Sequence, residues 1–227
     1  MKILIVTTSC DQLAPDHPTG LWLEEFTVPY TAFIEAGASI QVVSPRGGRV
    51  PIDPKTTPKE KDFDKWPDAL QALENTGRIV EVSADTFDAV FIPGGHGPMI
   101  DLVSDRDLQR LLADFDRQGK PIAAVCHGPA ALLNVSKENG EALVNQRRVT
   151  GFTDFEERLV MLHGVVPFLL EDALKDRGAH FESALLPMTA HVVRDGNLIT
   201  GQNPASSRKI AQKLLGALKE VGSASTL

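Results

Sequence analysis

Short, continuous apolar runs alternate with amphipathic stretches along most of the chain. Apolar, β-branched runs of this kind are typical of strands buried on both faces of a parallel sheet. Four runs predict such strands: Lys2–Thr8, Ser39–Ser44, Asp88–Gly95 and Pro121–Val125. Apolar positions at helical spacing predict long helices over Leu23–Ala36, Asp105–Gln118 and Pro204–Val221, and short ones over Pro67–Asn75, after Pro129, near Thr153 and in "EDALKDRG".

This alternation predicts an α/β fold, a three-layer sandwich in which helices cover both faces of a mostly parallel central sheet. The Asp-Gly pair in "HVVRDGNLITG" predicts an added hairpin. Residues 45–64 are rich in Pro, Lys and Asp, and we expect them to form a surface excursion. A single domain is expected over residues 1–221, with 222–227 ("GSASTL") as a flexible tail.

Composition narrows the class of protein further. The 227 residues carry a formal net charge of −7, which argues against nucleic acid or an anionic membrane as the main partner. No apolar run approaches the roughly 18 residues needed to span a bilayer, and the apolar N-terminal stretch is too short for a secretory signal. The chain has only two cysteines, Cys10 and Cys126, and a secreted scaffold held together by disulfides would have more. We therefore expect a cytoplasmic protein with free thiols.

Three unusual sequences follow predicted strands: "TTSCDQ", "PGGHG" and "CHG". In a doubly wound sheet, ligands bind beyond the carboxyl ends of the strands. Because all three sequences are expected at that edge, their convergence is stronger evidence for a site than any one of them alone.

Cys126 lies where an apolar strand must turn sharply into a helix. A nucleophile on such an elbow is exposed at the sheet edge, and the N-terminus of the following helix is expected to lower the pKa of its thiol. The alternative is a small buried hydrophobe. His127 and Gly128 directly after the cysteine favour the nucleophile.

His127 is a candidate general base or oxyanion stabiliser, with a helix-capping histidine as the alternative. A base in this position needs an orienting carboxylate. "TGFTDFEER" offers three: Asp154, Glu156 and Glu157. Thr153 and Glu156 fit a capping box, which leaves the choice open between the other two.

Two more stretches supply candidates. Backbone N–H groups of Gly94 and Gly95 can form one wall of an oxyanion hole, although glycines after a strand are commonly just a turn. His96 beside them either lines a pocket or is solvated. Glu24 and Glu25 begin the first long helix, where a carboxylate can reach a thiol at a strand end or simply favour the helix dipole.

Four motifs, "AAVCHGPAAL", "DAVFIPGGHGPMIDL", "VTGFTDFEE" and "LITGQNPASS", resemble the PfpI/ThiJ superfamily of the class I glutamine amidotransferase-like, flavodoxin-like fold. The similarity is greatest to its heat-shock chaperone-like branch, the glutathione-independent glyoxalases (glyoxalase III), and it covers nearly the whole chain. The metal-binding histidine cluster of some larger relatives has no clear counterpart, and the resemblance implies neither a metal nor a cofactor.

The resemblance assigns roles residue by residue. It implies Cys126 as the nucleophile, His127 as its partner and Glu157 as the acid of the triad. "TGLWLEEFTVPY" matches the family's thiol-bonding glutamate at Glu25, and Gly95 with His127 would supply the oxyanion N–H groups. Family members often form homodimers, which is expected here too.

The implied reaction converts methylglyoxal or a similar 2-oxoaldehyde to a 2-hydroxy acid, in the class of D-lactate dehydratase lyases. Cys126 adds to the aldehyde carbon, His127 or Glu25 moves a proton between the two carbons, and the thioester is hydrolysed. Deglycation of proteins or nucleotides is a variant of the same chemistry. The alternatives are a cysteine peptidase or amidase, and a stress chaperone or redox sensor of this fold.

Overall fold

The computed structural model describes residues 1–224 of the chain. Its central sheet has seven strands in the order β10-β11-β7-β6-β1-β4-β5, and every neighbouring pair is parallel except β10 with β11. The strands of this sheet are β1 (Lys2–Val6), β4 (Ser39–Ser44), β5 (Gly77–Arg78), β6 (Ala89–Ile92), β7 (Ile122–Val125), β10 (Val192–Asp195) and β11 (Leu198–Gly201). The predicted α/β fold with a mostly parallel sheet is confirmed, including the hairpin.

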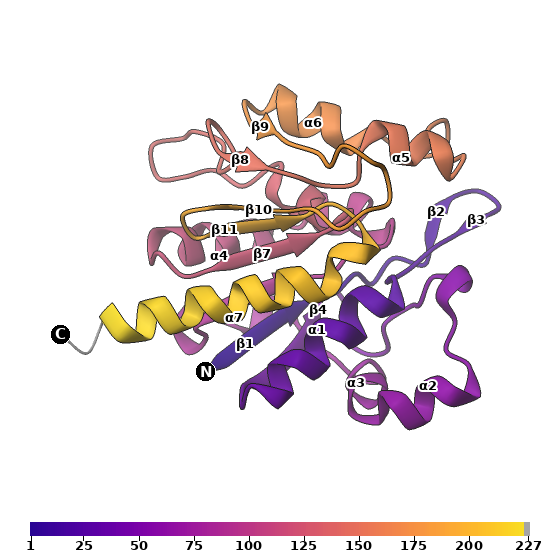
Figure 1. Cartoon of the computed structure of the whole chain (residues 1–227), viewed down its shortest axis with the longest axis horizontal. Coiled ribbons are helices and arrows are strands. Elements are labelled where there is room, and N and C mark those ends of the chain that lie inside the picture. The colour runs from indigo at the N-terminus through magenta and orange to yellow at the C-terminus, as the bar shows by residue number, and fades with distance from the viewer. Residues whose placement is uncertain (225–227) are drawn as a thin grey trace.

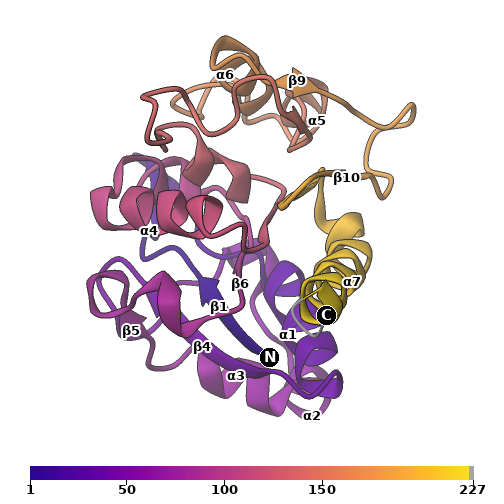
Figure 2. The same ribbon diagram turned by 90° about the vertical axis from the view of Figure 1, so that its left-hand side faces the viewer.

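Helices cover both faces of the sheet. Their bounds are α1 (Leu23–Glu35), α2 (Glu60–Lys65), α3 (Pro67–Ala72), α4 (Arg106–Arg117), α5 (Asp154–Leu159), α6 (Leu170–Asp176) and α7 (Ser207–Ala224). Figure 2 shows α4 on one side of the sheet and α1 with α7 on the other. The predicted closing helix begins as a short 3-10 turn, and α7 continues to Ala224. Of the predicted tail, residues 225–227 lie outside the described residues.

The core follows the two-residue period of the strands. Leu4 and Val6 of β1 belong to the cluster under α4, whereas Ile3 and Ile5 belong to the cluster under α1 and α7. All four side chains are fully buried. This two-sided burial explains why the strands read as continuous apolar runs. Among the described residues, no helix combines the length and apolar character that crossing a bilayer requires.

Shorter elements carry little apolar pattern and were not predicted. They are the hairpin β2 (Gln12–Ala14) with β3 (His17–Pro18), the parallel pair β8 (Arg148–Val149) with β9 (His180–Phe181), strand β5 and helix α2. Helix α2 lies within the expected surface excursion. The segment from β8 to β9, with α5 and α6, lies beyond the β10 edge of the sheet (Figure 1). Through this segment, the first residues of α5 lie next to the loops that follow the carboxyl ends of β6 and β7.

Candidate active site

Cys126 directly follows β7 and has a backbone φ of 60°, in the left-handed region. A non-glycine residue in this region is strained by roughly 1 kcal/mol or more and usually marks a constrained site. The bend turns the chain into the short helix expected after Pro129, which is a 3-10 turn over Gly128–Leu132. It also lets His127 fold back, so that Nδ1 of His127 lies 3.3 Å from Sγ of Cys126.

Glu157 in α5 lies on the other side of the imidazole. Its Oε2 is 2.7 Å from Nε2 of His127, and both side chains are buried. This bond and that to His96 lower the pKa of Glu157 to about 2 despite its burial, so the carboxylate is ionised. It must therefore accept a hydrogen bond from the Nε2–H of His127, which leaves Nδ1 unprotonated toward the thiol.

Burial, together with neighbouring His96, lowers the pKa of His127 to about 4, so the ring is neutral at neutral pH. The ring is also held in place by tilted contacts with two other rings. Its centroid lies 4.0 Å from that of His96 and 4.5 Å from that of Phe152. Phe152 was not singled out from the sequence, because one aromatic residue in a loop carries no signal of its own.

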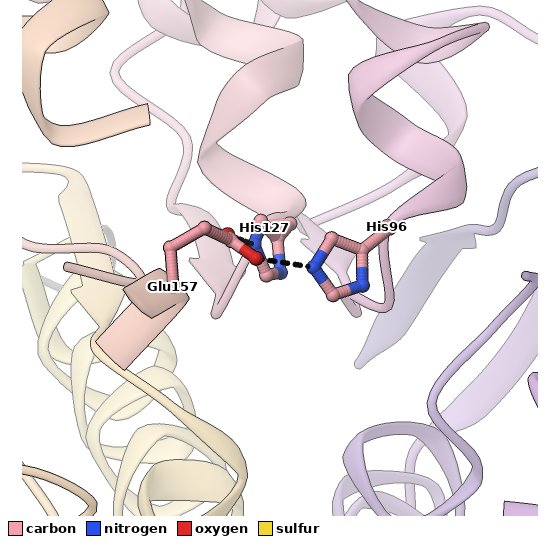
Figure 3. Close-up of side chains that lie close together, drawn as sticks. All are labelled: His96, His127 and Glu157. Atoms are coloured by element: carbon pink, nitrogen blue, oxygen red, sulfur yellow. Dashed lines mark hydrogen bonds and ion pairs between the residues drawn. The ribbon is translucent and has the colours of Figure 1, made fainter. Parts of the chain in front are cut away.

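His96 is buried and lines a cavity, so of the two placements considered from the sequence, pocket wall or solvated surface, the structure has the first. Its Nε2 lies 2.9 Å from Oε1 of Glu157, so the carboxylate joins two histidines (Figure 3). His96 also lines a cavity of about 180 Å³ whose other walls come from the β2–β3 hairpin, residues 53–55 and Leu162. The His96–Glu157 bond was not predicted from the sequence.

The other two acids near α5 have different partners. Glu156 closes the expected capping box with Thr153, and it also accepts hydrogen bonds from the backbone of Met188 and the side-chain amides of Gln202 and Asn203. Asp154 faces Glu171 and Asp172 instead of the histidine, and burial with these neighbouring charges raises its pKa to about 6. Glu157 alone of the three meets His127.

Glu25 reaches the thiol from α1, and its neighbour Glu24 is exposed. Oε2 of Glu25 accepts a hydrogen bond of 2.8 Å from the backbone N–H of Gly94. Complete burial raises the pKa of Glu25 to about 8, although hydrogen bonds to Cys126 and Gly94 oppose the rise. The carboxyl is therefore protonated at neutral pH and faces the sulfur as a neutral acid.

The expected lowering of the thiol pKa is wrong. Burial and the facing Glu25 carboxyl raise the pKa of Cys126 well above its usual value, and the N–H groups of Gly95 and His127 act against this rise. Cys126 is only 4% exposed. The five-residue 3-10 turn after it adds too little dipole to overcome desolvation. The resting residue is thus a thiol that needs a base.

Gly94 and Gly95 differ in what they offer. The N–H of Gly94 is taken by Glu25, so Gly94 supplies no donor to an oxyanion, contrary to its predicted role. The N–H groups of Gly95 and His127 both point at Cys126. Gly95 has a φ of 88°, and an added Cβ would lie 2.1 Å from the carbonyl oxygen of Gly20. Only glycine allows this approach.

The fold, with a thiol on the elbow after a parallel strand, defines a protein of the class I glutamine amidotransferase-like type. Residues 19–217 match the DJ-1/PfpI family, and the chain belongs to this family.

Three similar proteins illustrate its place in the family. Glutathione-independent glyoxalase HSP31 of Saccharomyces cerevisiae is 30% identical, covering 96% of this chain and 98% of its own. The Rapid Encystment Protein of Francisella tularensis is 36% identical with a TM-score of 0.90, covering 96% and 98% of the two chains. Candida albicans glyoxalase III is 26% identical with a TM-score of 0.86, covering 96% and 97%.

Proposed function

We propose that this protein is a glutathione-independent glyoxalase that converts methylglyoxal or a similar 2-oxoaldehyde to the 2-hydroxy acid, as a lyase that needs no cofactor. The observation that carries the proposal is the ordered series of contacts from Cys126 through His127 to Glu157, with the buried Glu25 carboxyl on the other side of the sulfur. The glyoxalase names of the relatives support the choice of substrate.

The first step is addition of the Cys126 sulfur to the aldehyde carbon. As the S–C bond forms, the thiol proton passes to Nδ1 of His127, and Glu157 stabilises the resulting imidazolium. The N–H groups of Gly95 and His127 receive the developing oxyanion. His127 then returns the proton to this oxygen, which gives a neutral hemithioacetal.

His127 is the better carrier for the next proton because its Nδ1 is unprotonated, whereas Glu25 keeps its proton near pH 7. It removes the proton from the former aldehyde carbon, forming an enediolate, and delivers it to the neighbouring carbon while the hydroxyl proton passes from the first oxygen to the second. The product is the thioester of a 2-hydroxy acid. Water hydrolyses the thioester, which releases the acid and restores the thiol, so the overall change is addition of one water.

Several features argue against a peptidase. The thiol is only 4% exposed, and the cavity that meets the site at His96 is about 180 Å³. Such a space suits a small aldehyde better than a polypeptide.

The cytoplasmic location and the homodimer expected from the sequence stay predictions.

The deciding experiment is a steady-state assay with methylglyoxal in the absence of glutathione, following lactate formation. We expect turnover by the wild-type protein and by Cys10→Ala. In the wild type the Cys10 thiol donates to the Gln12 carbonyl and does not belong to the site. Cys126→Ala should be inactive while melting like a folded protein. Lactate formation by Cys126→Ala at the wild-type rate would refute the mechanism.

A chaperone function is the second candidate, because large apolar side chains are exposed near α5. Leu185 is 98% exposed and Met161 81%. Phe155 and Leu185 line the same surface groove. If this surface binds unfolded clients, Leu185→Asp should abolish suppression of client aggregation and leave lactate formation intact. Equal suppression by Leu185→Asp and wild type would exclude this surface as the client site.

A further inference from the structure

Two imidazoles and one carboxylate converge at the site, in a buried cluster formed by His96, His127 and Glu157. One ligand-type atom from each residue lies within 4.8 Å of the others. The three residues come from separate elements, namely the loop after β6, the turn after β7, and α5 (Figure 3). Among residues 1–224, this is the one group of three such side chains in ligating arrangement.

We propose that this cluster binds a divalent cation of the zinc class, and that the bound ion inhibits the thiol chemistry. Two histidine nitrogens with a carboxylate are a common donor set for Zn²⁺, with water completing the coordination. This ion would be an inhibitor, because the proposed reaction uses the same groups without a metal. Binding of the ion does not require the glyoxalase assignment, whereas the inhibition rests on the proposed function and is tested separately.

The two His–Glu157 distances fit a small ion after a slight opening, and all three ligand atoms lie within 4.8 Å of one another. Nε2 of His96 and Nε2 of His127 lie 2.9 and 2.7 Å from the two oxygens of Glu157. Ligands around a tetrahedral zinc ion at about 2.0 Å are separated by about 3.3 Å. Each pair would therefore move apart by about half an ångström, which a shift of the α5 carboxylate can supply.

Access to the cluster is through the cavity that His96 lines. Asp16 and Asp53 line the same cavity, so its wall carries carboxylates that attract a cation. Lys55 is also in the wall and opposes this attraction in part. The cavity volume of about 180 Å³ leaves room for the ion and its remaining water ligands.

Inhibition follows from the atoms that the ion would occupy. The ion takes the lone pair of Nε2 in His127, so this ring must then carry its proton on Nδ1. That nitrogen faces Sγ of Cys126 at 3.3 Å and can no longer accept the thiol proton. Glu157 is bound to the ion as well and no longer stabilises a cationic ring.

Binding can be tested without substrate. In a Cys126→Ala background, which removes sulfur as a ligand, titration with Zn²⁺ by calorimetry should show one ion per chain. Co²⁺ added to the same protein should give visible absorption typical of four-coordinate nitrogen and oxygen ligands. His96→Leu in this background should weaken Zn²⁺ binding at least 100-fold and abolish the Co²⁺ band, and Glu157→Gln provides a second, independent removal of a ligand.

His17→Gln is the matched control, since His17 lines the same cavity but lies outside the cluster. It should bind Zn²⁺ with the affinity of the Cys126→Ala parent. Zn²⁺ should also inhibit wild-type turnover, and a chelator should reverse the inhibition. Stoichiometric binding that survives both His96→Leu and Glu157→Gln would overturn the proposal, as would no measurable binding by the Cys126→Ala protein.

Discussion

Sγ of Cys126 lies 3.3 Å from Nδ1 of His127, although the two residues are adjacent in the chain. Neighbouring side chains normally point apart, and only the left-handed backbone at Cys126 brings them together. The pair is therefore a product of the elbow. Its chemistry depends on the tautomer that Glu157 imposes from the far side of the ring.

Replacing His127 by Gln should remove the base and leave the thiol in place. We expect kcat for methylglyoxal to fall 10²- to 10⁴-fold with KM little changed, because the lost group acts in proton transfer. Loss of a partner for buried Glu157 should lower the free energy of unfolding by about 1–3 kcal/mol. Steady-state lactate assays and urea denaturation measure the two effects. Wild-type kcat in His127→Gln would exclude this residue as the proton carrier.

The pH profile of kcat/KM should be bell-shaped. Protonation of His127, whose pKa is lowered to about 4 chiefly by burial, removes the base on the acid side. Ionisation of Glu25, whose pKa is raised to about 8 chiefly by burial, places a negative charge beside the reacting sulfur and lowers the rate on the alkaline side. Glu60→Gln, at an exposed position outside the site, should keep the wild-type profile. An activity that stays constant from pH 7 to pH 10 would contradict the role of protonated Glu25.

Stability should depend on pH through the same carboxyl. Its folded pKa of about 8 exceeds its ordinary value of 4.5, so the folded state holds the proton more tightly. The stabilisation is complete below pH 4.5 and is lost as pH rises toward 8, by about 1.4 kcal/mol per pH unit. Urea denaturation of the wild type and Glu25→Gln at several pH values isolates this slope. Parallel pH dependences of the two proteins would show that Glu25 is ionised when folded.

Gly94→Ala should disrupt the site by contact alone. The added Cβ would lie 2.7 Å from Oε2 of Glu25 and 2.8 Å from the backbone nitrogen of His127. We expect at least a 100-fold loss of kcat/KM and destabilisation of about 1–3 kcal/mol. Gly216→Ala in α7 is the control, because its Cβ would meet no atom within 4 Å. It should be active and up to about 1 kcal/mol more stable. Full activity of Gly94→Ala would show that the Glu25 carboxyl is free to move.

Much of the architecture could be predicted because each long element has its own periodicity. The strands that flank the site are fully buried and read as apolar runs, and α4 carries its apolar residues on one face. Strands of two or three residues have no such period. Their existence depends on contacts between distant segments, as in β8 with β9.

The site was harder to predict because its electrostatics come from tertiary contacts. From the residues alone, Asp154, Glu156 and Glu157 were all acids at one helix start. The choice among them rests on how α5 meets the turn after β7, although the family resemblance named Glu157. The direction of the thiol pKa was missed for the same reason: it follows chiefly from burial of the sulfur, and then from Glu25, which belongs to a helix far earlier in the chain.

Glu156→Gln should loosen the segment before β10 rather than the nucleophile. Glu156 is fully buried and accepts hydrogen bonds from Thr153, Met188, Gln202 and Asn203. In Glu156→Gln one carboxylate oxygen is replaced by an NH₂ group, which faces these donors with its own N–H groups and cannot accept their hydrogen bonds. We expect destabilisation of about 2–4 kcal/mol and faster proteolysis within residues 183–190. Glu60→Gln, at an exposed position, should match the wild type. Unchanged proteolysis of Glu156→Gln would show that other contacts hold the segment.

The left-handed backbone at Cys126 sets two evolutionary pressures against each other. Glycine would relieve the strain there, yet it would abolish the thiol and remove a buried side chain from the core. Relief of strain and loss of packing therefore oppose each other at this position. A descendant freed from selection for the reaction could exchange the cysteine for another small residue and keep the paired histidines, as a binding protein without catalysis.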